Sequence, residues 1–185
     1  MKVNEVDRII TNFIESELNY ILSCVQGNTD IQSEFFSEPY VLFGKDFQYE
    51  TGFTELKGRF GIYIFYICEN ISLSYDDVSN FNKINKGASF NGIWRPMNLE
   101  ESTCFYVGSS VSKSLFSRLN EHFGKNSCTS SLHLNHPNRG NLKDKLKIYV
   151  FPVKFSCYDN TDIILRKIEQ KLHNNLNPTN GSSRT

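Results

Sequence analysis

Arg118 and His122 combine residue types and a spacing that suit chemistry on a phosphate ester. Both lie in Ser114–Phe123, a segment predicted to be a helix, and residues four apart project from one helix face. Arg offers a planar fork to phosphate oxygens and keeps its charge, whereas His can hydrogen-bond, transfer a proton or hold a water near neutral pH. Taken singly, each residue is equally typical of a solvated helix face, so the pair needs further partners.

Glu169 and Tyr63 are candidate partners from other parts of the chain. Glu169 lies in Asp159–Leu176, a second predicted helix, and its carboxylate suits one Mg²⁺ or Mn²⁺ ion that keeps most of its waters. A lone carboxylate is a weak metal site until a substrate phosphate adds its own oxygens. Tyr63 has an ordinary pKa near ~10, so it can act as a base only where a metal or cation lowers that pKa.

Three β-branched and aromatic segments are predicted strands that position these side chains. They are the run GRFGIYIFYI starting at Gly58, Cys104–Val107 and Lys147–Phe155. Val3–Val25 has apolar residues at helical spacing and is predicted to be an amphipathic helix that stops at Gly27-Asn28. With the two later helices, these elements predict an α/β fold: a small central three-stranded sheet flanked by helices, with an N-terminal helical arm and inserted loops.

The chain of 185 residues is long enough for one core and short for two. We expect an N-terminal helical arm and extension at 1–57, a main domain at 58–180 and a tail at 181–185. A polar, Asn-rich insertion at 69–103 interrupts the main domain between its first two predicted strands.

Charge and cysteine content narrow the class of protein. A net charge of zero argues against a general nucleic-acid coat protein, but 1–56 holds three Lys/Arg against ten Asp/Glu, and 106–185 holds twelve against five. This asymmetry favours one basic face, with charges solvated on every side as the alternative.

The five cysteines are scattered without a CxxC pair, which predicts reduced thiols. No apolar run approaches the ~20 residues of a membrane helix and the N-terminus lacks a signal peptide, so we expect a cytoplasmic protein without a membrane partner.

The order of these features resembles the GIY-YIG nuclease family. The first signature is Gly61-Ile62-Tyr63, and the second is Tyr106-Val107-Gly108, in which Val replaces the middle Ile. The step from Arg118 to His122, the late helical Glu169 and the ending Pro178-x-Asn180 also fit. The resemblance runs from about Gly61 to Asn180, interrupted by 69–103, where the family usually has a short turn.

The resemblance implies a role for each matched residue. Tyr63 would be the general base or a water-orienting phenol, and Tyr106 would pack near the phosphate and hydrogen-bond there. Arg118 would bind the scissile phosphate, and His122 would assist at the nucleophile. Glu169 would hold the metal on the leaving-group side, and the products would carry a 5′-phosphate and a 3′-hydroxyl. The supporting residues would be Gly61, Gly108, Ser110, Lys113 and Asn180, of which Lys113 is equally typical of a surface lysine.

The freestanding size resembles the type II restriction endonucleases of this family, which cut double-stranded DNA at specific sites. Such enzymes place recognition in insertions and terminal arms, which here are 1–57, 69–103 and 124–140. Many are homodimers, because a palindromic site mirrors a two-fold axis. The candidate base-reading residues are Arg95, Asn135, Asn138 and Arg139. The alternatives are a repair, phage or mobile-element nuclease that reads DNA structure, and a catalytically silent DNA-binding adaptor.

A zinc site is an alternative use of the segment 124–140. Cys128, His133 and His136 have ligand chemistry, but their spacing lacks a clear fourth ligand. We favour a polar loop that reaches a DNA groove, and an inert solvated loop stays open.

Overall fold

The computed structural model describes residues 3–28, 30–48, 53–69, 71, 73, 103–124, 132, 134–135, 141–154 and 160–179. Its helices are α1 (Val3–Val25), α3 (Leu115–Phe123) and α4 (Thr161–Leu176), with short 3₁₀ turns η1 (Gly44–Asp46), η2 (Thr54–Leu56) and η4 (Leu142–Lys145). Its strands are β1 (Tyr40–Phe43), β2 (Gly61–Ile67), β3 (Cys104–Ser110) and β4 (Leu146–Pro152). The predicted α/β class is confirmed.

The sheet has four strands, so the prediction of three was wrong. All neighbours are antiparallel and the order is β1-β4-β2-β3, which leaves β1 and β3 at the edges. β1 lies in the part of the N-terminal extension for which the sequence predicted no element. Its signal is weak because it is a short edge strand, in which Val41 is 47% exposed and Phe43 is 43% exposed.

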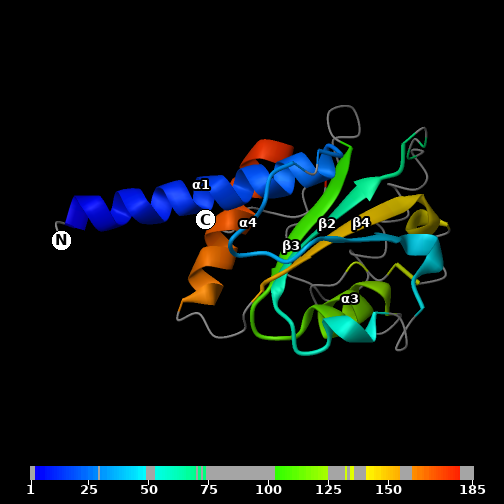
Figure 1. Cartoon of the computed structure of the whole chain (residues 1–185). Coiled ribbons are helices and arrows are strands. Elements are labelled where there is room, and N and C mark those ends of the chain that lie inside the picture. The colour runs from blue at the N-terminus through cyan, green and yellow to red at the C-terminus, as the bar shows by residue number, and fades with distance from the viewer. Residues whose placement is uncertain are drawn as a thin grey trace, which may run out of the picture.

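Helices cover both faces of the sheet (Figure 1). Side chains alternate along β2, so that Ile62 and Ile64 join the core beneath α1 and α4. Tyr63 and Phe65 point to the other face, where they join the core beneath α3. The sheet therefore separates two apolar cores, and Tyr63 belongs to the α3 side.

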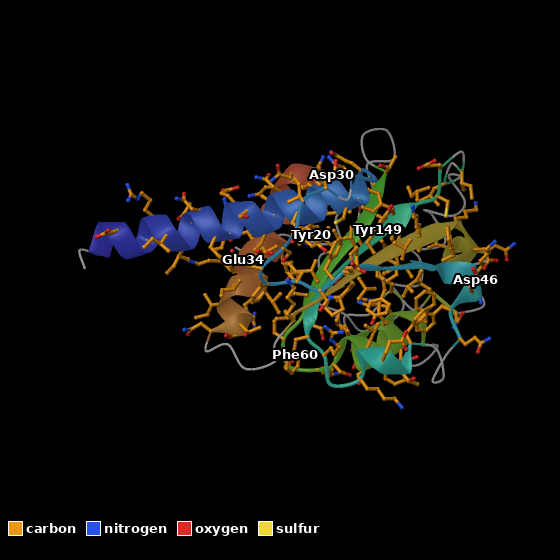
Figure 2. The ribbon with its side chains drawn as sticks, viewed as in Figure 1. Tyr20, Asp30, Glu34, Asp46, Phe60 and Tyr149 are labelled. Carbon is orange, nitrogen blue, oxygen red and sulfur yellow. The ribbon has the colours of Figure 1, made fainter. Side chains whose placement is uncertain are left out.

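α1 has the predicted bounds, and its predicted stop is confirmed. The N–H groups of Gly27 and Asn28 donate to the carbonyls of Cys24 and Ser23, at 3.1 and 2.9 Å, which closes the last turn. The C-terminal half of α1 packs on the sheet, where Tyr20 donates to the Ser37 carbonyl at 3.2 Å (Figure 2). The N-terminal half extends beyond the sheet (Figure 1).

A β-bulge shifts the register between β2 and β3. Phe65 pairs with Tyr106 but Tyr66 pairs with Cys104, so Phe105 is the extra residue of β3. As a result, Phe105 and Tyr106 both pack on the α3 side, although they are consecutive. Tyr106 lies two residues before Gly108, the partner of Tyr63, so regular alternation places it on the face of Tyr63, and the two rings are stacked at a centroid distance of 6.2 Å.

Several predicted boundaries move by a few residues. The last strand ends at Pro152, after which Val153 forms only an isolated bridge with Phe36. Asn160 occupies the N-cap of α4, but its φ of 72° is left-handed and its side chain makes no capping hydrogen bond. Within the described part of the chain, no helix is both long and apolar enough to span a membrane.

Candidate active site

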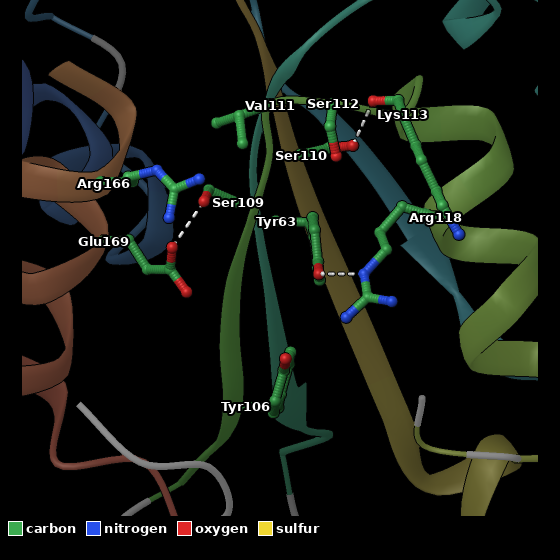
Figure 3. Close-up of a pocket in the computed structure, with 10 residues that line it drawn as sticks. All are labelled: Tyr63, Tyr106, Ser109, Ser110, Val111, Ser112, Lys113, Arg118, Arg166 and Glu169. Carbon is green, nitrogen blue, oxygen red and sulfur yellow. Dashed lines mark hydrogen bonds between the residues drawn. The ribbon is translucent and has the colours of Figure 1, made fainter. Parts of the chain in front are cut away.

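A hollow of about 230 Å³ opens at the edge of the sheet formed by β3, between α3 and α4 (Figure 3). Four of the five predicted catalytic residues line it, and they come from four elements: Tyr63 from β2, Tyr106 from β3, Arg118 from α3 and Glu169 from α4. The other described lining residues are Ser109, Ser110, Val111, Ser112, Lys113 and Arg166. His122, the fifth predicted catalytic residue, is not among them.

The hydroxyl oxygen of Tyr63 is contacted by two of the other predicted catalytic residues, Arg118 and His122. Arg118 donates its Nε–H to this oxygen at 3.2 Å, and His122 Nε2 lies 3.0 Å from it. The Tyr63 side chain is 1% exposed, so these contacts form away from bulk water. Two helical residues that are one turn apart therefore hold the phenol of a strand residue from the same side.

His122 is fully buried behind Tyr63. Its Nδ1 accepts a hydrogen bond from the backbone N–H of Leu132 at 3.1 Å, so this nitrogen carries no proton. The proton of the neutral ring then sits on Nε2 and is donated to the Tyr63 oxygen. In this arrangement His122 reaches the pocket through the tyrosines that line it: it is bonded to Tyr63, and its ring packs against that of Tyr106 at a centroid distance of 5.2 Å.

The two signature glycines each remove a Cβ that would collide. A Cβ at Gly108 would lie 2.4 Å from the Tyr63 hydroxyl oxygen, because Gly108 pairs with Tyr63 across the two strands. A Cβ at Gly61 would lie 2.1 Å from the carbonyl oxygen of Phe151. Gly108 therefore makes room for a side chain, whereas Gly61 makes room for the backbone of β4.

Arg118 is fixed by a carboxylate on its own helix. Its Nη1 donates to Glu121 at 2.8 Å, and Lys113 also pairs with Glu121. Burial works against the charge on Glu121, but the hydrogen bonds from Lys113 and Arg118 outweigh it and lower its pKa. Although burial opposes the charge on Arg118 too, Tyr63 and Glu121 raise its pKa further, so this guanidinium stays charged.

Both tyrosines of the pocket resist ionisation. Burial raises the pKa of Tyr63 well above its ordinary value and the neighbouring Tyr106 adds to this, whereas the charge and hydrogen bond of Arg118 lower it without cancelling the effect of burial. Burial also raises the pKa of Tyr106, against the opposing charge of Arg118. Both side chains are therefore neutral phenols near neutral pH.

Glu169 faces the pocket from the opposite wall to Arg118 (Figure 3). Ser109 donates its hydroxyl to Glu169 Oε2 at 2.5 Å, which fixes one carboxylate oxygen. One turn later on α4, burial lowers the pKa of His173, against a hydrogen bond to the Val107 backbone and the charge of Glu169. No group of three or more His, Cys, Asp or Glu side chains with metal-ligand geometry occurs among the described residues, so Glu169 is a single carboxylate.

Ser110 and Lys113 shape the turn after β3. Ser110 is 2% exposed and donates its hydroxyl to the Lys113 carbonyl at 2.5 Å. The next residue, Ser114, caps α3 by accepting from the Ser117 N–H at 3.2 Å. This turn fixes the start of α3 and thereby the position of Arg118 at the pocket.

Most of the predicted recognition residues belong to segments that the structure does not describe. Arg95, Asn138, Arg139 and Asn180 lie outside the described residues, as do most of 69–103 and the alternative zinc ligands Cys128, His133 and His136. Asn135 is half-buried and its N–H donates to the Phe123 carbonyl at 3.2 Å, away from the pocket lining. Thr179, just before Asn180, is tied to β3 by its N–H, which donates to the Cys104 carbonyl at 2.9 Å.

Ser109, Glu121 and Arg166 lie beside the predicted catalytic residues but were not singled out from the sequence. Glu121 lies three residues after Arg118, and Arg166 lies three residues before Glu169, so helix periodicity was the available signal.

None of the protein-family models, curated proteins or solved structures compared with this chain matches it.

Proposed function

We propose that this protein is a metal-dependent DNA endonuclease of the GIY-YIG type that hydrolyses phosphodiester bonds, leaving a 5′-phosphate and a 3′-hydroxyl. One observation carries the proposal: Tyr63, Arg118 and Glu169, far apart in sequence, line one hollow from three different elements. A cation, a neutral hydroxyl and a carboxylate around one small space are the groups that a phosphodiester and its attacking water require.

Arg118 is the residue that binds the scissile phosphate. Its planar fork matches phosphate oxygens, and its attachment to Tyr63 and Glu121 holds the fork in one orientation before substrate arrives. Such preorganised charge stabilises the developing negative charge without a reorganisation cost during the reaction.

Tyr63 is a neutral phenol that orients the attacking water. Its oxygen accepts from Arg118 and from His122, and its O–H also interacts with the Tyr106 hydroxyl, so an attacking water would take over that donor. The raised pKa means that the phenol keeps its proton near neutral pH, which favours the water-orienting role over the general-base role. His122 is then a positioning residue for Tyr63 and not a proton carrier.

The donor set around Glu169 fits one hydrated Mg²⁺ or Mn²⁺ ion. Glu169 is the one acid among the described lining residues, and the Ser109 hydroxyl is bound to it. Such a set suits a hard cation whose other ligands are waters and substrate oxygens. A bound ion there would supply Lewis-acid stabilisation of the leaving 3′-oxygen. Ser109 holds one oxygen of Glu169 in place.

The direct test is incubation of the purified protein with phage DNA and Mg²⁺ or Mn²⁺, alongside Glu169→Gln and the matched control Glu5→Gln on the exposed end of α1. We expect the wild type and the control to cut, and Glu169→Gln to bind DNA without cutting. Cleavage by Glu169→Gln in Mg²⁺ would exclude the metal assignment. Binding without cutting by the wild type would instead identify an adaptor.

The cutting pattern separates the two kinds of nuclease. Discrete fragments from linear duplex DNA support a site-specific, restriction-like enzyme, for which we propose a homodimer. Cutting of only branched or damaged DNA supports a repair or mobile-element enzyme. We propose that base reading falls to Asn135, Asn138, Arg139 and Arg95. Single alanine substitutions that leave the ratio of cutting between preferred and variant sites unchanged would remove a residue from this role.

A further inference from the structure

Arg166 stands on the wall of the pocket that faces Arg118. It lies on α4, three residues before Glu169, and its side chain reaches the pocket beside Glu169 and Ser109 (Figure 3). Arg118 shares Glu121 with Lys113, so one of these two positive charges on the α3 wall is balanced. Arg166, in contrast, forms no ion pair with any described residue. It therefore lies beside the Glu169 carboxylate as a guanidinium that no described residue binds.

Arg166 also borders a second hollow. This hollow of about 220 Å³ lies along α4 and is lined by Ile163, Arg166, Lys167, Glu169, Gln170 and His173. Arg166 and Glu169 line both hollows, so the two spaces adjoin across these two residues. The first is mainly polar and the second mainly apolar, which matches an alternation of phosphate with sugar and base.

We propose that Arg166 forms a second phosphate site, which binds the phosphodiester next to the scissile one, and that the DNA strand runs from the catalytic pocket across α4 into the second hollow. This inference rests on the proposed endonuclease function and adds the path of the strand. The guanidinium can bind a phosphate oxygen with two parallel N–H donors. Its position beside Glu169 lets one strand contact Arg118, Glu169 and Arg166 in turn.

The site also serves to align the substrate. A strand held at Arg118 alone can pivot about one phosphate, whereas a second contact fixes its direction across the carboxylate. Alignment of this kind acts on the chemical step as well as on binding. Loss of Arg166 should therefore lower both affinity and the rate of bound-DNA cleavage.

The test compares Arg166→Ala, Arg166→Lys and the matched control Arg8→Ala, which removes an exposed arginine from α1. Binding to a duplex oligonucleotide is measured in chelator over a series of salt concentrations, so that the DNA stays uncut. One lost phosphate contact should reduce the slope of log affinity against log salt by about 0.9. Arg166→Ala should show this reduction with about tenfold weaker binding, Arg166→Lys should keep the slope, and Arg8→Ala should match the wild type.

Cleavage under single-turnover conditions with Mg²⁺ supplies the second measurement. Arg166→Ala should cut saturating DNA about tenfold or more slowly than Arg8→Ala, because the strand is misaligned. If the wild type binds and cuts but Arg166→Ala keeps its salt slope, the second phosphate site is wrong and the endonuclease stands. If the wild type neither binds nor cuts DNA, both the proposed endonuclease function and the second phosphate site are wrong.

Discussion

Gly108 lies directly opposite Tyr63 in the β2–β3 pair, with the Tyr63 ring lying over the place where a Cβ would be. A Cβ at this position would lie 2.5 Å from the ring carbon that carries the hydroxyl. The glycine of the second signature therefore sets the position of the tyrosine of the first.

Gly108→Ala should damage activity much more than stability. The added methyl group must push the Tyr63 ring aside, which breaks its contacts with Arg118 and His122. A displacement of about 1 Å can cost about 100-fold in rate. Cleavage rate and thermal melting, measured on the same preparation, check this. A variant with wild-type activity would mean that the Tyr63 phenol need not sit where it does.

Gly61→Ala should do the reverse and mainly destabilise the fold. Its Cβ would meet the carbonyl of Phe151, a backbone atom of the central strand pair that cannot rotate away. Overpacking of this kind costs about 1–3 kcal/mol. Urea unfolding gives the free energy of unfolding, with Gly108→Ala as the paired comparison. Equal stability of Gly61→Ala and wild type would contradict the close approach of β4.

His122→Leu should lower activity mainly through Tyr63, to whose hydroxyl His122 is bonded. The substitution removes the donor to the Tyr63 oxygen and leaves the Leu132 N–H without its acceptor. His122→Gln retains an N–H donor and should recover part of the rate. The discriminating measurement is a double-mutant cycle with Tyr63→Phe: we expect His122→Leu to cost little further in that background. Fully additive losses would give His122 a role independent of Tyr63.

Arg118→Lys should lose most of its activity, and Arg118→Ala should lose more. Lys keeps the charge but cannot contact Tyr63 and Glu121 as a planar fork does. Arg8→Lys on α1 is the matched control and should cut at the wild-type rate. Wild-type cleavage by Arg118→Lys would exclude the bidentate phosphate role.

Tyr63 should make stability fall at alkaline pH. Its pKa in the folded protein is raised by burial, so it is neutral in both states below about pH 10 and ionises first in the unfolded chain above that. Each such group removes about 1.4 kcal/mol of stability per pH unit between its unfolded and folded pKa. Tyr63→Phe should therefore lose stability less steeply than wild type above pH ~10. Parallel curves of unfolding free energy against pH would contradict the raised pKa.

Sequence reasoning reached the elements with strong periodicity and missed those that depend on tertiary partners. α1 has its predicted bounds because its apolar face repeats over many turns. β1 was missed because a four-residue edge strand exposes alternate side chains and draws its stability from pairing with β4. The sheet could thus be predicted only in part.

The candidate site divides in the same way. Residue types and their order nominated Tyr63, Arg118 and Glu169, which the fold brings to one pocket. The contact of Ser109 with Glu169 joins residues 60 positions apart, and no local sequence pattern predicts it. The burial of His122 behind Tyr63 was equally invisible, because an i+4 spacing fixes a helix face but not its depth.

The two ends of the connection between β2 and β3 are held together. The Ile67 N–H donates to the Thr103 carbonyl at 2.8 Å, and the Cys68 N–H donates to the Lys145 carbonyl at the same distance. When the ends of a connection are held together, its length has a small effect on the free energy of folding, since each doubling of a flexible loop adds only about 0.6 kcal/mol of closure entropy. The length of the connection therefore has little effect on the pairing of β2 with β3, which places Tyr63 opposite Gly108. Selection can in this way change what approaches the pocket while the strands that build it stay in register.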